Sequence, residues 1–263
     1  MELRGRTVLV TGATGGLGAA IVRALAARGA VPILTGRRTD VLEPLADETV
    51  GRAIAADLAA ADDVDRLLAE AGDVDVLVAN AALPGSGHIT SFSVEEIDRA
   101  LDVNLRAPII LARLLADGMA ARGGGHMVFM SSLNGKLAPP GTPIYAATKF
   151  GLRGFAQSLR QDLQPLGIGV SAIFPGFIRD AGLFHDARVE MPAYVRTKLP
   201  DDVGSAVVEA IEKDRAEVDV APLTMKIGTV LGRVAPDAAA IVQRRLGAAR
   251  LSSQFAAGQR DKR

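Results

Sequence analysis

The sequence predicts an α/β fold in which a doubly wound parallel sheet carries helices on both of its faces. Two observations predict it: short apolar runs bounded by glycine or proline alternate with segments of helical period, and 49% of the residues are hydrophobic. Continuous apolar strands separated by amphipathic helices are typical of βαβ units around a buried sheet. Parallel-sheet domains commonly exceed about 200 residues without splitting. We therefore expect one domain over residues 1–263.

The alternation can be followed along the whole chain. Strands are expected within 7–11, 31–36, 52–57, 73–80, 125–132, 167–176 and 216–222. Helices are expected within 17–29, 39–48, 62–72, 93–121, 144–163 and 201–215. After Met225 the pattern changes to two helical segments broken at Pro236, and the polar tail from Ser252 is expected to fray.

Composition excludes several classes of function. Thirty basic residues balance thirty acidic residues, so no nucleic-acid partner is expected. The absence of cysteine excludes disulfides, thiolate nucleophiles and cysteine-ligated metals. The three histidines, His88, His126 and His185, are isolated, and we expect no metal site. No basic-then-apolar leader opens the chain, and no apolar run reaches the roughly 18 residues of a membrane span, so we expect a soluble cytoplasmic protein.

A glycine-rich turn, "TGATGGLG", joins the first strand to the first helix. Gly12, Gly16 and Gly18 stand where a backbone bends sharply, approaches a pyrophosphate and packs a helix on a sheet. The helix N-terminus offers free N–H groups to the anion. We interpret the turn as a dinucleotide site, although its spacing differs from G-x-G-x-x-G and an ordinary tight turn is the alternative.

The end of the second strand indicates which nicotinamide cofactor would bind. In such folds a carboxylate at this place accepts the ribose 2′-hydroxyl, whereas an arginine accommodates a 2′-phosphate. Gly36 stands at the position where such folds have the carboxylate, and Arg37 and Arg38 follow it. Because guanidinium groups bind phosphate well, NADP(H) is favoured over NAD(H). The alternative is that both arginines are solvated loop residues, with Asp40 close by.

Tyr145 and Lys149 are one turn apart on the helix expected from Ile144. A phenol ordinarily titrates near pH 10, and a neighbouring ammonium lowers its pKa by favouring the phenolate. Tyr145 is therefore a candidate general acid or base for a carbonyl or alcohol oxygen. Ser132, thirteen residues earlier, is a candidate hydrogen-bond partner of that oxygen. Tyrosine and lysine at this spacing also occur on ordinary helix surfaces, so the pair alone does not establish a catalytic role.

Several motifs occur together in order. They are "TGATGGLG", "NAA" after the fourth strand, Asn104 in a long helix, Ser132, Tyr145 with Lys149, and "PG" after the sixth strand. The set resembles the short-chain dehydrogenase/reductase family, classical subtype, over about Arg4 to Ala221. The resemblance implies a Rossmann-type sheet of about seven strands and no metal. It also implies a homo-oligomer, a dimer or tetramer, in which the helix holding Gly151 and Gly154 packs on a neighbour.

The resemblance also implies roles for single residues. Ser132 would orient the carbonyl, Tyr145 would act as acid or base, and Lys149 would hold the nicotinamide ribose and lower the pKa of Tyr145. Asn104 would position a proton-relay water. The implied cofactor contacts are Gly12, Thr14, Gly16, Leu17, Gly18, Arg37, Arg38, Asp57, Leu58, Asn80, Ala81, Tyr145, Lys149, Pro175, Gly176 and Ile178.

Three departures from the family pattern stand out. "ANAA" replaces the common "NNAG", which puts Ala82 in place of a glycine. "PGFIRD" puts Asp180 where a threonine often contacts the nicotinamide amide, and an ionised carboxylate donates no hydrogen bond. The backbone of Ile178 still suits the amide, and the role of Asp180 is left open. The third departure is a helical extension over 223–263.

Two segments bear on the substrate and on partners. Residues 179–200 lie where the family places a substrate lid, and Leu183, Phe184, Met191 and Tyr194 suit an apolar alcohol or ketone unless they only pack two short helices. The extension sets five basic residues among apolar faces: Lys226, Arg233, Arg244, Arg245 and Arg250. Such helices lie on a membrane surface or pack over a cleft or second subunit, and we favour the packing.

The sequence thus predicts an NADP(H)-dependent oxidoreductase that transfers hydride between the nicotinamide and an apolar carbonyl or secondary alcohol. A dinucleotide-binding module without turnover is the alternative from another class, motivated by Asp180 and the extension. Retention of Ser132, Tyr145 and Lys149 argues against that module. An isomerase or dehydratase with tightly held cofactor is a further alternative on the same fold.

Overall fold

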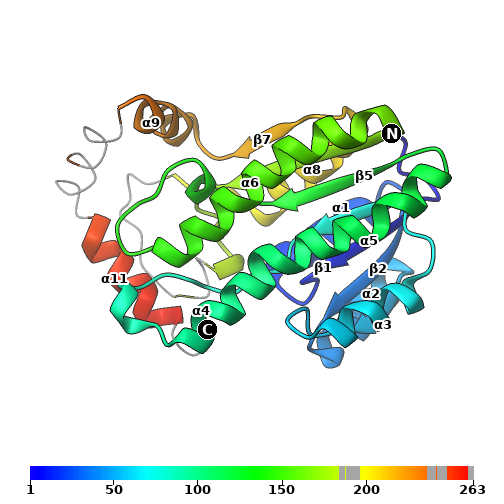
Figure 1. The fold of residues 1–263 in the computed structure, drawn as a ribbon, viewed down its shortest axis with the longest axis horizontal. Helices are drawn as coiled ribbons and strands as arrows, with labels where there is room; N and C mark the ends of the chain where they lie inside the picture. Colours follow the sequence, from blue (N-terminus) through cyan, green and yellow to red (C-terminus); the bar gives the residue numbers. More distant parts are fainter. Residues whose placement is uncertain (184–186, 188–195, 236–240, 242–247, 260–263) are drawn as a thin grey trace.

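The computed structural model describes residues 1–183, 187, 196–235, 241 and 248–259. At its centre is a seven-stranded parallel sheet in the order β3-β2-β1-β4-β5-β6-β7 (Figure 1). The strands are β1 (Thr7–Thr11), β2 (Val31–Gly36), β3 (Arg52–Ala55), β4 (Val76–Ala79), β5 (Gly125–Met130), β6 (Ile168–Pro175) and β7 (Glu217–Val220). The predicted doubly wound sheet is confirmed.

Helices connect the strands and cover both faces of the sheet (Figure 1). The α-helices are α1 (Gly16–Ala26), α2 (Thr39–Thr49), α3 (Ala61–Ala71), α4 (Val94–Leu101), α5 (Ala107–Ala121), α6 (Pro143–Leu163), α8 (Pro200–Glu212), α9 (Leu223–Val234) and α11 (Ala248–Gln259). Short helical turns are η1 (Ile89–Ser91), η2 (Asp102–Arg106), η3 (Leu133–Gly135) and η4 (Gln164–Leu166).

Two apolar clusters hold the three layers together. Helices α3, α5 and α6 pack on one face of the sheet, and α1, α2 and α8 pack on the other. In β1, Leu9 points to the first cluster, whereas Val8 and Val10 point to the second, because successive side chains of a strand alternate between faces. Each such side chain contributes about 1.5 to 3 kcal/mol when fully buried, which explains why the central strands are continuously apolar.

The strand order creates a crevice at the carboxyl ends of β1 and β4. These strands are neighbours, but the chain runs from β1 towards β2 and β3 and later from β4 towards β5. The loops that follow them therefore leave in opposite directions, and ligands of doubly wound sheets bind at this point. The fold thus brings the glycine turn, the loop after Ala79 and the residues after Met130 to one edge.

The expected helix over 93–121 is interrupted, which corrects the prediction of one continuous element. Helix α4 ends at Leu101, a π-helical turn follows over Asp102–Arg106, and α5 begins at Ala107. Pro108 has no N–H to donate to the carbonyl of Asn104, four residues earlier, so a regular α-helix cannot close there. The interruption places Asn104 on a turn that faces the loop after β4.

The tail also differs from its prediction. Residues from Ser252 to Gln259 belong to α11, so the expectation that this part frays was wrong. Phe255 stacks on Phe177, and the backbone of Gly258 lies against Ala187, so tertiary contacts stabilise a segment whose composition is polar. The predicted break at Pro236 lies outside the described residues, and α9 ends before it. Among the described residues, no helix has the length and apolar character needed to cross a bilayer.

Candidate active site

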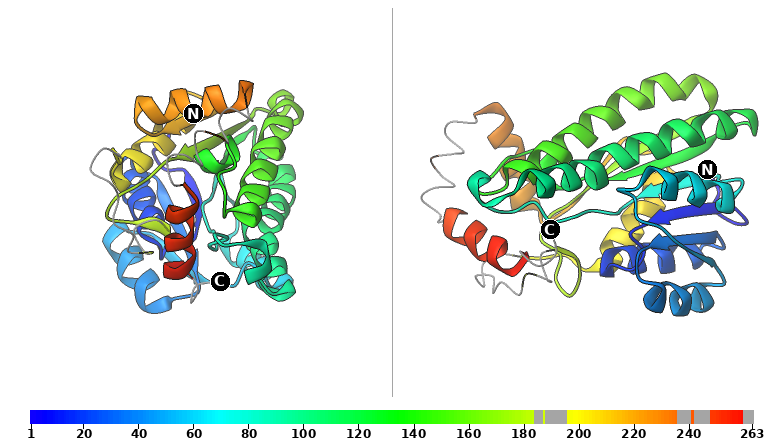
Figure 2. Two further views of the ribbon diagram at one scale, coloured as in Figure 1. Left: turned by 90° about the vertical axis from the view of Figure 1, so that its left-hand side faces the viewer. Right: turned by 60° about the horizontal axis from the view of Figure 1, so that its bottom comes forward.

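A cavity of about 850 Å³ lies along the carboxyl edge of the sheet. All of the residues predicted to contact a cofactor line it, and so does Ser132. Asn104 does not line it and lies directly behind the lining residue Leu83. Helix α11 crosses this edge in front of the strands (Figure 2). The structure therefore brings together residues that are spread from Gly12 to Gln259 in the chain.

The turn after β1 is built so that only glycine fits at its closest points. Gly12 has a φ of 65°, and a Cβ there would lie 2.7 Å from the Cα of Ala81. A Cβ on Gly18 would collide with the carbonyl of Gly12. Asn80 braces the turn, because its side-chain nitrogen donates to the carbonyls of Thr11 and Gly12, at 3.0 and 3.2 Å. This compact cradle at the start of α1 fits the pyrophosphate of a dinucleotide.

Arg37 and Arg38 lie at the end of β2, beside the glycine turn. Arg38 donates from Nη2 to the carbonyl of Thr14 at 2.5 Å, which holds its guanidinium at the cavity. Asp57, after β3, pairs with Arg99 at 2.8 Å. Partial burial works to raise the pKa of Asp57, but hydrogen bonds from Arg99 and from the N–H of Ala59 outweigh it and lower that pKa. This end of the cavity therefore offers both arginines to an anion and keeps Asp57 ionised.

Ser132 follows β5 and begins the turn η3. Its hydroxyl accepts from the N–H of Asn134 at 3.1 Å and lies 3.5 Å from the carbonyl of Pro175. Tyr145, in the first turn of α6, lies close enough to Ser132 for this side chain to lower its pKa. The two hydroxyls therefore lie where one carbonyl or alcohol oxygen can contact both of them.

Burial raises the pKa of Tyr145 to about 12, and the nearby Ser132 offsets this only in part. The sequence predicted a lowered pKa, so the structure without a ligand contradicts that direction. The reason is the position of Lys149, whose Nζ donates to the carbonyl of Met130 at 2.8 Å and lies 5.5 Å from the centre of the Tyr145 ring. Burial lowers the pKa of Lys149 to about 8. In this state the phenol of Tyr145 is protonated at neutral pH.

Asn104 holds the loop that follows β4. Its Oδ1 accepts from the N–H of Leu83 at 2.6 Å, and its Nδ2 donates to the carbonyl of Leu83 at 2.9 Å. The side chain is thereby fully engaged with backbone and is 1% exposed. Its predicted role in positioning a proton-relay water stays a prediction.

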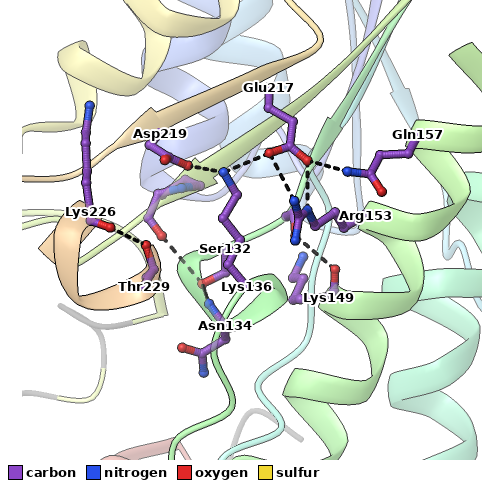
Figure 3. A network of polar contacts seen from close by, with 12 residues as sticks. Ser132, Asn134, Lys136, Lys149, Arg153, Gln157, Glu217, Asp219, Lys226 and Thr229 are labelled. Carbon is purple, nitrogen blue, oxygen red and sulfur yellow. Dashed lines mark hydrogen bonds and ion pairs between the residues drawn. The ribbon is translucent and has the colours of Figure 1, made fainter. Parts of the chain in front are cut away.

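A polar network anchors the catalytic turn to the edge of the sheet (Figure 3). The Nζ of Lys136 lies 2.9 Å from Glu217 and 2.6 Å from Asp219, both on β7. It also lies 3.8 Å from the centre of the Phe174 ring. Arg153 on α6 pairs with Glu217 at 2.7 Å. The network therefore ties β7, η3 and α6 together next to Ser132.

Asp180 does not lie in the cavity. It has a φ of 67°, its side chain is 70% exposed, and its carboxylate lies 3.6 Å from Arg179. Ile178 lines the cavity and is buried. The backbone after Phe177 is held by hydrogen bonds with Lys198. Of the predicted lid residues, Leu183 lines the cavity, whereas Phe184, His185, Met191 and Tyr194 lie outside the described residues.

Sequence reasoning missed several residues of the cavity. Gly85 contacts the backbone of Tyr145, and Met225, Phe255 and Gln259 line the cavity from the extension. Gln259 donates to the carbonyl of Leu183 at 2.8 Å, while its Oε1 is buried without a hydrogen-bond partner. The glycine after "NAALP" was the one available signal for Gly85, whereas nothing local connects α11 to the sheet edge. Within the described residues, no group of acidic or histidine side chains is arranged to hold a metal.

Comparison with known proteins decides the family. A sequence model of the short chain dehydrogenases matches residues 6–191. The chain belongs to this family. The ketoacyl reductase HetN of Nostoc sp. is 34% identical over 248 residues, which cover 89% of this chain and 86% of that protein.

Solved structures agree with this membership. One short-chain dehydrogenase/reductase family protein has a TM-score of 0.77 at 32% identity and covers 83% of this chain and 97% of its own. A short-chain dehydrogenase from Sphingobium yanoikuyae in complex with NADPH has a TM-score of 0.74 at 28% identity, with 86% and 92% covered. As a short-chain dehydrogenase, the protein is an oxidoreductase that uses a nicotinamide cofactor and acts on a small molecule.

Proposed function

We propose that this short-chain dehydrogenase is an NADP(H)-dependent reductase of apolar ketones, with Tyr145 as its general acid. One observation carries the proposal: Ser132, Tyr145, Lys149 and the glycine turn line the same cavity, and Ser132 lies close enough to Tyr145 to lower its pKa. The nicotinamide supplies the hydride when it is bound. The chain supplies the hydrogen bonds to the substrate oxygen and the proton that this oxygen gains.

The protonation state of Tyr145 suits the reductive direction of hydride transfer. With a pKa of about 12, the phenol carries its proton throughout the neutral range and is ready to donate it to a developing alkoxide. Ser132 holds the same oxygen, which stabilises negative charge as it forms. Oxidation of an alcohol instead needs the phenolate, and the positive charge of Lys149 and of the oxidised nicotinamide would favour that form. The same residue can therefore serve as acid in reduction and, as phenolate, as base in oxidation.

The preference for NADP(H) rests on Arg37 and Arg38. Both line the cavity at the end of β2, where Gly36 leaves no carboxylate to repel a 2′-phosphate. A Cβ on Gly36 would lie 3.0 Å from the Cγ2 of Thr14, so little space is left for a side chain at this position. The neighbouring structure from Sphingobium yanoikuyae, which contains NADPH, supports the assignment.

The substrate class follows from the lining of the cavity. Seven large side chains that line the cavity are apolar, and they are Leu83, Val103, Leu133, Phe177, Leu183, Met225 and Phe255. Such a surface favours an apolar ketone over a sugar or a nucleotide. The similarity to HetN, which is named a ketoacyl reductase, supports a carbonyl on an acyl chain as one member of this class. A cytoplasmic location and a homo-oligomer stay predictions from the sequence.

A panel of aliphatic ketones with NADPH tests the proposal. The wild-type protein is expected to consume NADPH and to form the alcohol, whereas Tyr145→Phe is expected to lose about 10²-fold or more of kcat while it still binds NADPH. Equal and negligible rates for both proteins across the panel would refute the reductase and favour a cofactor-binding module. Turnover of an added substrate without net NADPH consumption would instead favour an isomerase or dehydratase.

The cofactor assignment has a separate test. Arg37→Ala combined with Arg38→Ala is expected to weaken NADPH binding at least about tenfold and to change NADH binding little, because only NADPH carries the 2′-phosphate. Arg113→Ala is the matched control, since Arg113 is an exposed arginine on α5 that pairs with Asp117. Equal weakening of both cofactors in the double variant would mean that the two arginines do not read this phosphate.

A further inference from the structure

Helix α9 is oriented with its apolar side towards solvent. Five large aliphatic side chains on it are between 52% and 81% exposed, and they are Leu223, Ile227, Val230, Leu231 and Val234. At about 100° per residue, these five positions fall within a single arc of about 100°. We call this arc the aliphatic stripe. The stripe is unusual because an apolar helix face normally packs on the core.

The opposite side of α9 packs on the protein. Thr229 is buried and donates to the carbonyl of Lys226, and Met225 lines the catalytic cavity. The helix follows the edge strand β7 directly and lies at the periphery of the molecule (Figures 1 and 2). The helix therefore separates the cavity from whatever contacts the aliphatic stripe.

Charge is distributed unevenly along the chain. The extension 223–263 contains eight of the thirty basic residues and two of the thirty acidic residues. The other 222 residues consequently contain 22 basic against 28 acidic residues. Helix α9 itself has no acidic residue, and Lys226, which is half-buried, lies at one border of the stripe. The stripe thus belongs to a strongly basic segment of an otherwise acidic chain.

We propose that the aliphatic stripe of α9 docks on the surface of an anionic lipid bilayer. A helix with one apolar face, basic residues at its border and no acidic residue lies in the plane of such a surface, with its apolar face in the acyl boundary. The attraction between the basic extension and anionic headgroups adds to the apolar contact. The net charge of the whole chain is zero because the excess of acidic residues in 1–222 balances the excess of basic residues in 223–263.

The composition of the stripe suits a lipid surface. The residues that contribute most to protein–protein binding are mainly tryptophan, tyrosine and arginine, whereas leucine and valine are under-represented among them. Interfaces between copies of one chain are more apolar, and the sedimentation test below separates that case. The stripe is entirely aliphatic and has no aromatic side chain. Contact with acyl chains requires no hydrogen bonds or fixed geometry, so aliphatic side chains are sufficient for it.

Met225 lines the cavity from the opposite side of the same helix, so docking would hold the proposed site about one helix diameter from the bilayer. An apolar ketone dissolved in the bilayer would then be concentrated near that site. This consequence rests on the proposed function, whereas the docking itself does not.

Co-sedimentation of the full chain with lipid vesicles tests the docking. The protein is expected to bind vesicles that contain phosphatidylglycerol, to bind pure phosphatidylcholine more weakly, and to dissociate as salt is raised. Val230→Glu combined with Leu231→Glu is expected to weaken this binding at least about tenfold. Val50→Glu combined with Val94→Glu is the matched control, because it introduces the same two glutamates at exposed aliphatic positions elsewhere and should leave binding intact.

Three results would overturn the proposal. These are no binding to anionic vesicles, equal binding by both double variants, and conversion of an oligomer to a monomer by the α9 variant alone in sedimentation velocity. The last result would make the stripe a subunit contact. Reduction of a water-soluble ketone by the α9 variant separates docking from catalysis. If the α9 variant reduces the ketone at the wild-type rate but no longer binds vesicles, the proposal is supported. If no protein reduces the ketone while the wild type still binds vesicles, only the proposed function is refuted.

Discussion

Gly85→Ala tests whether the position of Tyr145 controls the chemistry. Gly85 is buried in the loop after β4, and a Cβ there would lie 2.9 Å from the backbone nitrogen of Tyr145 and 3.2 Å from its Cα. Because a carbon needs about 3.4 Å or more at such a contact, the start of α6 must retreat by roughly half an ångström. Misplacing a reacting group by 1 Å lowers the reaction rate about 10²-fold, so a shift of half that size should lower kcat about tenfold.

The assay is steady-state reduction of the best ketone with NADPH, together with NADPH binding and thermal unfolding. The affinity for NADPH is expected to stay within about twofold, because the glycine turn and the arginines lie on other loops. Overpacking should also cost about 1 to 3 kcal/mol of unfolding free energy. Gly228→Ala is the control, since a Cβ at that exposed helical glycine meets nothing. A folded Gly85→Ala with wild-type kcat would refute the reasoning.

Three further predictions concern stability and assembly. Burial lowers the pKa of His126 to about 4, so between pH 6.5 and 4 the unfolded chain takes up the proton first. Stability should therefore fall on acidification by about 3 kcal/mol in wild type and by less in His126→Asn, as measured by urea unfolding. Lys136→Met removes two ion pairs and should cost on the order of 2 kcal/mol in the same assay, whereas the exposed control Lys213→Met should cost less than about 1 kcal/mol. A Cβ on Gly154 would meet nothing within the chain, so Gly154→Leu should disturb only a subunit contact and shift a homo-oligomer towards monomer in sedimentation velocity; an unchanged oligomer would exclude this face of α6 as a contact.

The fold and the cavity lining were predictable because they depend on signals that are local in the chain. The buried run of β1 requires apolar residues, and the turn after it requires glycine at Gly12. The carboxyl ends of parallel strands meet at one edge, which is why Arg37 after β2 and Ser132 after β5 both line the cavity. The interruption near Asn104 also had a local signal in Pro108, which was not used.

The remaining features depend on contacts between distant residues. Tyr145 and Lys149 are one turn apart, but the spacing does not reveal that Nζ bonds to the carbonyl of Met130 rather than acting on the phenol. Burial then decides the direction of the Tyr145 pKa. Phe255 reaches Phe177 across 78 residues of chain, so the polar composition around it gave no indication of a helix over the cavity.

Transfer of deuterium from the reduced nicotinamide tests the central claim most directly. NADPH carrying deuterium at both C4 positions of its ring is incubated with a ketone, and the alcohol is analysed by mass spectrometry. The account predicts that wild type places the deuterium on the carbinol carbon, and that Tyr145→Phe binds NADPH yet forms almost no labelled alcohol. Unlabelled product from wild type, or labelled product formed equally fast by Tyr145→Phe, would contradict it.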